Sequence, residues 1–163
     1  MSDGARQPSP LLATGSVARN RRARFDYHIE EDIEAGLVLT GTEVKSLRCG
    51  GVNLSDAYAG PSEEGLTLFN LYIGPYAHAH RLQQHEPKRP RTILLHRRQR
   101  DRLLGALRRQ GYSLIPLALY FNARGLLKLS LGLGKGKKEV DKRDVVKERD
   151  WRRRQGRVLR ALG

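Results

Sequence analysis

The 163-residue sequence predicts a mainly β (α+β) domain: a small antiparallel barrel with two or three flanking helices and a basic C-terminal tail. Three observations lead to this prediction. Short apolar runs alternate with turn-forming residues through the middle of the chain, as in small barrels. Helical periodicity is confined to a few segments. Positive charge is concentrated at the two ends.

The first elements follow in chain order. Residues 1–16 are rich in small and turn-forming residues and are expected to form a flexible leader. An acidic stretch then precedes residues 36–39 (GLVL), which predict a buried strand. Residues 42–48 (TEVKSLR) predict a short helix with Thr42 as its N-cap, and Gly50 and Gly51 are expected to end it.

Two hairpins are predicted. The first joins residues 52–60 to residues 66–76 around the turn PSEEG, and the second joins residues 112–122 to residues 125–134 around NARG. Strands of this number and length fit a barrel of the oligonucleotide-binding (OB) type. Periodicity alone leaves other α+β arrangements open.

Between the hairpins, residues 77–91 contain two prolines and many polar side chains and are expected to form a loop. Residues 92–111 predict the best helix of the chain, with Leu103, Leu104 and Leu107 as its apolar stripe and a glycine at its end. Residues 17–133 are therefore expected to be the barrel domain, and residues 134–163 its tail.

The net charge of +14 is unevenly distributed. Residues 1–24 carry +4 and residues 134–163 carry +7, whereas the 109 residues between them carry only +3. Such a surplus indicates a polyanionic partner, and basic arms and loops suit a folded RNA better than duplex DNA. A membrane surface is the weaker alternative, because no apolar run has the length of a membrane span and no secretion signal is visible. The single cysteine, Cys49, suits a reducing cytoplasm.

No catalytic set is evident. GLGLGKGKK does not meet the spacing of a phosphate-binding loop, so a flexible strand exit with phosphate-seeking lysines is favoured. His78, His80 and His85 are expected to be solvated in a loop. Four neighbouring carboxylates predict a solvated or anion-repelling face, although a metal-dependent nuclease site is the enzymatic alternative: Glu30, Glu31, Asp32 and Glu34.

The tail has helix-supporting pairs four residues apart, Glu148–Arg152 and Asp150–Arg154, but few apolar residues. It is therefore expected to be disordered when free and helical against a polyanion. Trp151 is expected either to stack on RNA or to pack back on the barrel.

Four segments together resemble the small protein B (SmpB) family, the SsrA-binding proteins that partner transfer-messenger RNA. They are ARNRRARFDYHIEEDIEAGLVLTGTEVKSLRCGGVNLSDAY, PRTILLHRRQ, GYSLIPLALYF and GKGKKEVDKRDVVKERDW, and the resemblance extends from about Val17 to Trp151. The combination of AGLVLTGTEVKSLR with LGKGKKEVDKR is specific.

The resemblance implies an OB-type barrel that binds the tRNA-like domain of transfer-messenger RNA (tmRNA, or SsrA) in the bacterial cytoplasm. It implies ribosome rescue by trans-translation, with the tail in the decoding centre and empty mRNA channel, against 16S rRNA. Elongation factor Tu and alanyl-tRNA synthetase would be indirect partners through the charged RNA. No enzymatic activity, cofactor, metal or membrane is implied. The alternative function is that of a ribosomal RNA-binding or ribosome-assembly protein.

The resemblance also implies two sets of site residues. The tmRNA-binding set on the barrel is Asn20, Arg22, Arg24, Glu34, Lys45, Arg48, Arg91, Leu94 and Lys128. The ribosome-binding set of the tail is Lys135, Lys137, Lys138, Asp141, Lys142, Arg143, Lys147, Arg149 and Trp151. This sequence departs from the family at Val140, where a histidine or an aromatic ring often precedes DKR, so a stacking contact is not expected there.

Overall fold

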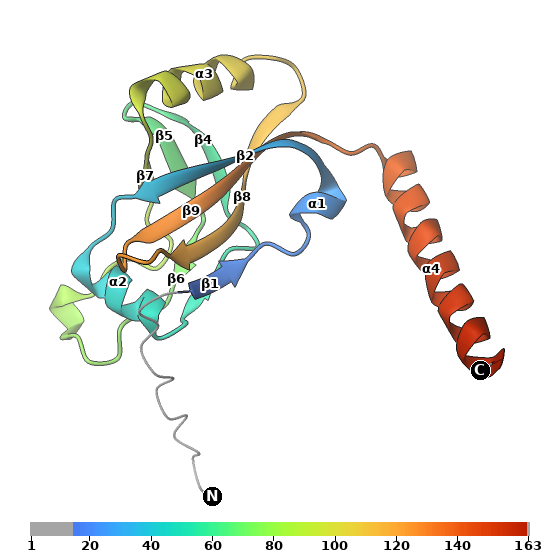
Figure 1. The fold of residues 1–163 in the computed structure, drawn as a ribbon. Helices are drawn as coiled ribbons and strands as arrows, with labels where there is room; N and C mark the ends of the chain where they lie inside the picture. Colours follow the sequence, from blue (N-terminus) through green and yellow to red (C-terminus); the bar gives the residue numbers. More distant parts are fainter. Residues whose placement is uncertain (1–14, 163) are drawn as a thin grey trace, which may run out of the picture.

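The computed structural model describes residues 15–162, without the side chains of Glu139 and Leu162. Most of the predicted leader, residues 1–14, lies outside the described residues. The described chain is a β-barrel with helices at its ends and a long C-terminal helix that extends away from it (Figure 1).

The barrel is a closed ring of antiparallel strands. Following the paired strands from β8 through β4, β5, β7, β2 and β9 leads back to β8. The strands are β2 (Tyr27–Leu37), β4 (Tyr58–Ser62), β5 (Gly65–Phe69), β7 (Arg91–Leu94), β8 (Tyr112–Phe121) and β9 (Leu127–Gly136). This closure leaves few free sheet edges and agrees with the predicted antiparallel barrel.

Three short strands lie outside the ring. β1 (Gly15–Arg19) pairs with the distal half of β8, and β3 (Val52–Asn53) pairs with β6 (Tyr72–Ile73) in a separate two-stranded sheet. β1 was not predicted, and Gly15 and Ser16 of the expected leader belong to it.

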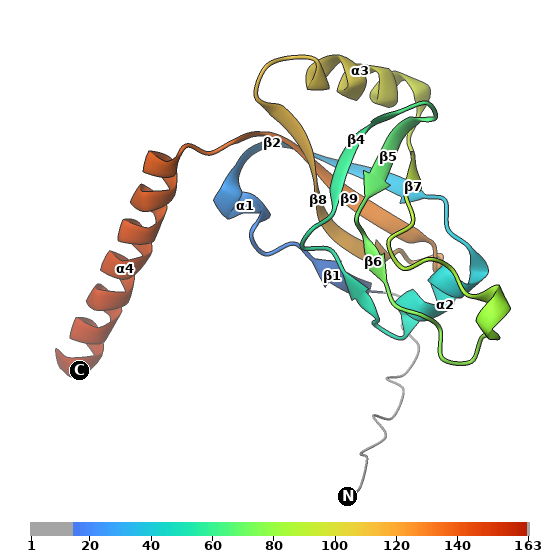
Figure 2. The ribbon, with the colours of Figure 1, turned by 180° about the vertical axis from the view of Figure 1, so that it is seen from behind.

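The helices occupy distinct places around the barrel. α3 (Arg97–Leu107) covers one end, α2 (Gly41–Arg48) lies near the opposite end, and the single turn α1 (Ala23–Asp26) leads into β2 (Figures 1 and 2). A 3₁₀ turn spans Arg81–Gln83, and α4 (Glu139–Leu162) is the tail. None of the helices within residues 15–162 has both the length and the apolarity needed to cross a membrane.

The core is almost entirely aliphatic, as the composition predicts. In β9 the inward residues Leu129, Leu131 and Leu133 are buried, whereas the alternate residues Lys128 and Ser130 are partly exposed. Leu47 from α2 and Leu103 from α3 have no exposed area and join the same cluster. The helices thereby close the apolar interior of the barrel.

The seam between β2 and β9 depends on glycine. A Cβ atom at Gly134 would overlap the main-chain oxygen of His28 and lie 3.1 Å from the Cα atom of Ile29. The same seam contains a register shift between Ile29 and Glu31. The close approach lets β9 pair with β2 and β8 at once, which completes the ring.

Both predicted hairpins are confirmed. β4 and β5 pair around Glu63 and Glu64, and β8 and β9 pair from Tyr112 opposite Lys135 to Phe121 opposite Leu127. β9 continues to Gly136, so the barrel extends three residues beyond the predicted boundary at residue 133.

Three local predictions were wrong. The N-cap of α2 is Thr40 rather than Thr42, because Glu43 then stands at the third helical position and accepts the Thr40 N–H. Residues 92–94 belong to strand β7, and α3 begins only at Arg97. Of the strand predicted at residues 36–39, only Gly36 and Leu37 are in β2, which begins at Tyr27 and includes the acidic stretch.

The glycine at the seam gives a testable prediction. We expect Gly134→Ala to lower the free energy of unfolding by about 2 kcal/mol, because main-chain atoms of β2 must move to admit a methyl group. Gly136→Ala on the same strand is the matched control, since its Cβ would meet nothing nearer than 4.0 Å. Urea denaturation measures both, and equal stabilities would contradict the close-approach explanation.

Candidate RNA interface

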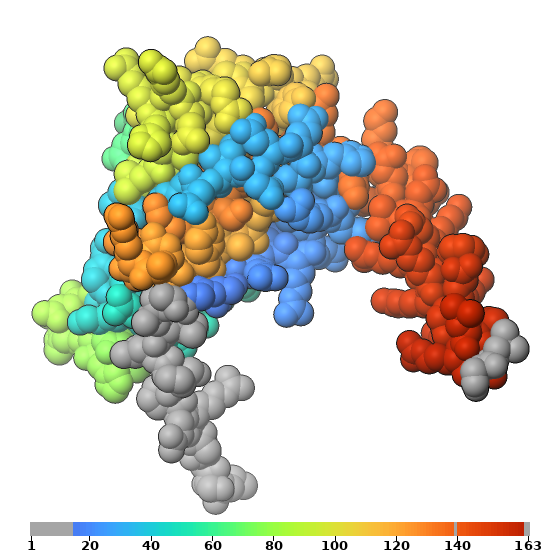
Figure 3. Space-filling model, in the orientation of Figure 1, coloured from blue at the N-terminus to red at the C-terminus, as the bar shows by residue number. Residues whose placement is uncertain are grey.

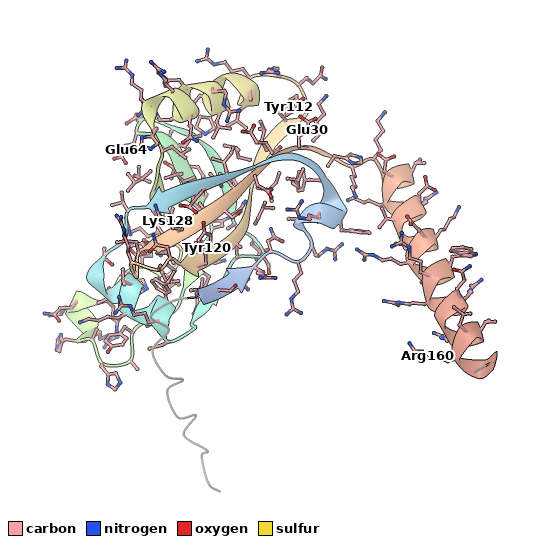
Figure 4. All side chains as sticks on the ribbon, in the orientation of Figure 1. Glu30, Glu64, Tyr112, Tyr120, Lys128 and Arg160 are labelled. Atoms are coloured by element: carbon pink, nitrogen blue, oxygen red, sulfur yellow. The ribbon has the colours of Figure 1, made fainter. Side chains whose placement is uncertain are left out.

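A polar cluster lies on the outer face of the barrel, where β2, β8 and β9 are adjacent. Lys128 is directly opposite Tyr120 on one side and Gly36 on the other, so these positions and Glu34 share one face. The Tyr120 hydroxyl donates a hydrogen bond to Glu34, and Lys128 Nζ lies 3.7 Å from Glu34 Oε1. Figure 4 shows Tyr120 and Lys128 on neighbouring strands.

Partial burial and the bond to Glu34 raise the pKa of Tyr120 to about 12. At neutral pH the hydroxyl is therefore protonated and remains a donor, while the Glu34 carboxylate presents acceptor oxygens. The cluster thus combines a cation, an anion and a neutral donor within a short distance.

A hollow of about 360 Å³ adjoins this cluster on the side of β7. Its lining includes Glu34, Lys128 and Leu94, whose side chain is 52% exposed. Leu94 pairs with Gly36, and a Cβ atom on that glycine would approach Leu94 Cβ to 3.3 Å. The missing side chain at residue 36 therefore gives Leu94 room on the outer surface.

A second hollow, of about 540 Å³, adjoins the cluster on the side of β1 and α1. Tyr120 and Ser130 line it, together with Asn20, Arg24 and further residues of the same segments: Arg19, Arg21, Leu117 and Ala118. We call the cluster and its two hollows the barrel face. Figure 3 shows the surface over β2 and β9, with α4 standing away from it.

The four predicted carboxylates do not converge on one point. Tyr112 donates to Glu30, Arg102 makes two 2.7 Å bonds to Glu31, and Arg24 lies 3.1 Å from Asp32. The hydrogen bonds from Arg102 hold the pKa of Glu31 below its usual value. Across residues 15–162 no group of three or more histidines, cysteines or carboxylates is arranged to hold a metal ion.

Arg91 has a structural position rather than one on the barrel face. Its side chain has no exposed area, its Nε bonds to the equally buried Glu43, and its Nη1 donates to the Leu71 carbonyl at 2.5 Å. Glu43 also accepts from Arg89 at 2.6 Å. These bonds join α2, β7 and the loop before β7, so Arg91 is removed from the RNA-binding set.

Burial alone would raise the pKa of Glu43. The hydrogen bonds from the Thr40 N–H, Arg89 and Arg91 outweigh burial and hold this pKa below the usual carboxyl value. Glu43 therefore remains ionised in the folded protein at neutral pH.

A family model described as SmpB protein matches residues 17–161. The chain belongs to the SmpB family. It is 54% identical over 159 residues to the SsrA-binding protein of Rhodospirillum rubrum, covering 98% of this chain and 99% of the relative. It is 55% identical over 144 residues to that of Caulobacter vibrioides, covering 88% and 94%.

A solved structure is similar as well. It is described as "tmRNA-SmpB: a journey to the center of the bacterial ribosome", and its matching chain is 43% identical. The TM-score is 0.62, with 85% of this chain and 95% of that chain covered. Family membership and fold class therefore agree with the resemblance seen in the sequence.

The remaining residues expected from the SmpB resemblance lie away from the two hollows of the barrel face. Lys45 and Arg48 are on α2, each with its cation 5.7 Å from an aromatic ring, of Tyr76 and Phe121 respectively. Arg22 lies at the base of α1, 3.8 Å from Asp26.

The tail residues are distributed over three places. Lys135 is in β9, with Nζ 4.7 Å from the Tyr112 ring, and Lys137 and Lys138 connect it to α4. Trp151 is 59% exposed, so it does not pack back on the barrel. The other members lie on α4: Asp141, Lys142, Arg143, Lys147 and Arg149.

Two expectations about individual residues change. His85 is buried rather than solvated: its Nε2–H donates to the Ile73 carbonyl at 2.9 Å, and Nδ1 is hydrogen-bonded to the Thr42 hydroxyl at 2.9 Å. Tyr120, at the centre of the barrel face, was not predicted. Its place opposite Lys128 in the predicted hairpin is the signal that could have found it.

The buried pair gives a second prediction. We expect Arg91→Met to lower the free energy of unfolding at neutral pH by about 3 kcal/mol, because Glu43 keeps its charge but loses a buried partner. A carboxyl with a lowered folded-state pKa contributes stability above its unfolded-state pKa, and this contribution is lost as pH falls through the folded-state value. The difference between variant and wild type should therefore narrow in acid.

Urea denaturation at several pH values measures this difference. Arg102→Met is the matched control, because its bidentate partner Glu31 is partly exposed and the loss should stay below about 1 kcal/mol. If the two variants lose equal stability, the buried Arg91–Glu43 pair stabilises the fold no more than an exposed ion pair does, and the prediction is wrong.

Proposed function

We propose that this protein binds the tRNA-like domain of tmRNA through its barrel face and delivers that RNA to stalled ribosomes for trans-translation. The observation that carries the proposal is the convergence of predicted residues from distant segments on one face. Asn20 and Arg24 precede the barrel strands, Glu34 lies on β2, Leu94 on β7 and Lys128 on β9. The names of the relatives and of the similar solved structure support this choice of RNA.

The chemistry of the barrel face suits a folded RNA with unstacked bases. Lys128 and Arg24 offer cations for phosphates. Glu34 accepts hydrogen bonds from the amino groups of a base edge, and the exposed Leu94 offers an apolar contact. Because Glu34 repels phosphates, the RNA backbone should lie against Lys128 and Arg24 rather than against this carboxylate. A uniformly basic surface would not distinguish base edges from phosphates in this way.

The tail would act on the ribosome. α4 has 24 residues and is rich in arginine and lysine, so as a helix of about 36 Å it suits an RNA-lined channel. In the proposed function it occupies the decoding centre and the empty mRNA channel, in contact with 16S rRNA. Its disorder in the free protein and its folding on the ribosome stay part of the proposal.

In the proposed function, this protein is a cytoplasmic RNA-binding protein and not an enzyme. Each carboxylate of the acidic stretch has its own partner on the protein, which supports a structural and recognition role for these groups. Elongation factor Tu and alanyl-tRNA synthetase would meet the complex through the charged RNA.

The barrel face gives a third prediction. Lys128→Ala should weaken binding of the tRNA-like domain about tenfold, or about 1.4 kcal/mol. It should also reduce the slope of log affinity against log salt by about one, because one phosphate contact is lost. Fluorescence anisotropy at several salt concentrations measures both quantities. Lys88→Ala, an exposed loop lysine of equal charge, is the control. Equal losses in the two variants would indicate non-specific attraction instead of a defined site.

A fourth prediction separates the tail from the barrel. Because β9 extends to Gly136, the tail should be deleted after Lys138 rather than after Leu133. This truncated protein should bind the tRNA-like domain within about threefold of the full chain but should not support peptide tagging on stalled ribosomes. A loss of RNA affinity by orders of magnitude would mean that the tail also holds the tmRNA.

A further inference from the structure

The tail begins as a continuation of the β2–β9 ladder. The last paired residues are Tyr27 and Gly136, and one step further the Lys137 N–H donates to the Asp26 carbonyl at 2.8 Å. The chain therefore enters α4 while still bonded to the end of α1.

Side chains continue this contact into the first turn of α4. The Asp26 carboxylate lies 3.3 Å from Lys142 Nζ, and His28 Nε2 lies 3.4 Å from Asp141 Oδ2. Asp141 also accepts the Lys138 N–H at 3.3 Å, where a carboxylate stabilises the N-terminus of a helix. Asp26 thus uses both its main-chain oxygen and its carboxylate on the tail.

The next two turns of α4 contact the Phe25 ring. Lys142, Val146 and Arg149 are spaced by four and three residues and share one helix face. The Arg149 guanidinium lies 5.7 Å from the centre of the Phe25 ring, and Arg22 lies 5.5 Å from it. Val146 and Phe25 line a mainly apolar hollow of about 530 Å³ between α1 and α4.

α1 is itself held to the barrel. Ala23 is buried, the Asn20 N–H donates to the Leu117 carbonyl at 2.8 Å, and the Asp26 N–H donates to the Arg22 carbonyl at 2.9 Å. Beyond Arg149 the residues of α4 whose burial is described are exposed, apart from the partly exposed Gly156. The contact between tail and body is therefore limited to the first three turns of α4 on one side and to α1 and the start of β2 on the other.

We propose that α1 is the mount of α4 and that Asp26 is a positioning residue that sets the direction of the tail from the barrel. A helix of about 36 Å magnifies small changes at its base, since a rotation of about 10° moves its far end by roughly 6 Å. That displacement is comparable to one helical turn and would change which phosphates the tail arginines meet. This functional consequence rests on the proposed function, whereas the mount itself is a property of the free chain.

The individual contacts are weak, which is why Asp26 matters. A surface ion pair contributes about 1 kcal/mol or less, so no single pair orders a helix of this length. Asp26 is the residue where a main-chain bond, the pair with Lys142 and the pair with Arg22 meet. The partner-dependent ordering proposed for the tail then concerns the turns beyond Arg149.

Spin-label distance measurements on the full chain test the mount without any RNA. The labels would be placed at Glu63→Cys on the barrel and Asp144→Cys in the mounted part of α4, in a Cys49→Ser background, because all three positions are exposed. We expect one narrow distance distribution in this protein. Asp26→Asn should broaden it by several ångströms, and Asp26→Glu should largely preserve it.

Asp101→Asn is the matched control, because it removes an equal charge from a carboxylate on α3 whose partners, Arg97 and Arg100, are neither on α4 nor on the barrel face. Lys142→Gln removes the other side of the pair and should broaden the distribution as Asp26→Asn does. Unfolding midpoints and affinity for the tRNA-like domain should be unchanged in all four variants. An unaltered distribution in both Asp26→Asn and Lys142→Gln overturns the proposal.

Peptide tagging on stalled ribosomes tests the consequence. Asp26→Asn should reduce tagging several-fold at unchanged RNA affinity, and Asp101→Asn should not. A broadened distribution with full tagging overturns the positioning role. If the unsubstituted protein does not bind the RNA, the proposed function fails, and the distance measurements alone decide whether α1 is the mount.

Discussion

The close approach of β2 and β9 is the constraint on which the rest of the molecule depends. β9 pairs with β2 on one side and β8 on the other, and only a residue without a side chain fits at Gly134. This arrangement closes the ring, brings Glu34, Tyr120 and Lys128 onto one face, and fixes the point where the tail leaves. One steric requirement thus determines both the barrel face and the base of α4.

Charge has opposite roles inside and outside this barrel. Glu43 and Arg91 are fully buried and satisfy each other, so they join α2 to β7 at the cost of desolvating two ions. On the surface, Glu34 pairs only loosely with Lys128 and keeps its oxygens accessible to a ligand. The same residue types therefore serve as an internal tie in one place and as recognition groups in the other.

The sequence was sufficient for the features that depend on local signals. Alternation and turn residues predicted both hairpins. The tail's charge pairs indicated a segment able to form a helix on a partner, and α4 lies in this segment. Features that depend on distant partners were missed. β1 is a strand because it pairs with an edge of β8. The sequence of β7 could not be distinguished from the start of the helix that follows it, so residues 92–94 were assigned to that helix. Arg91 looks like any loop arginine until Glu43, 48 residues earlier in the chain, is placed beside it. Both Thr40 and Thr42 are residues that commonly cap a helix, and only the position of Glu43 identifies Thr40 as the N-cap.

The exposed turns of α4 beyond Arg149 and the packed barrel differ in how freely their residues can be substituted. Substitutions in these turns remove no core contact, so they cost little folding free energy beyond the intrinsic helix preference of each residue. This segment can therefore change in sequence to follow changes in a partner's surface without first acquiring compensating substitutions in the barrel. Gly134 at the β2–β9 seam has no such freedom, because any side chain there would overlap main-chain atoms of β2.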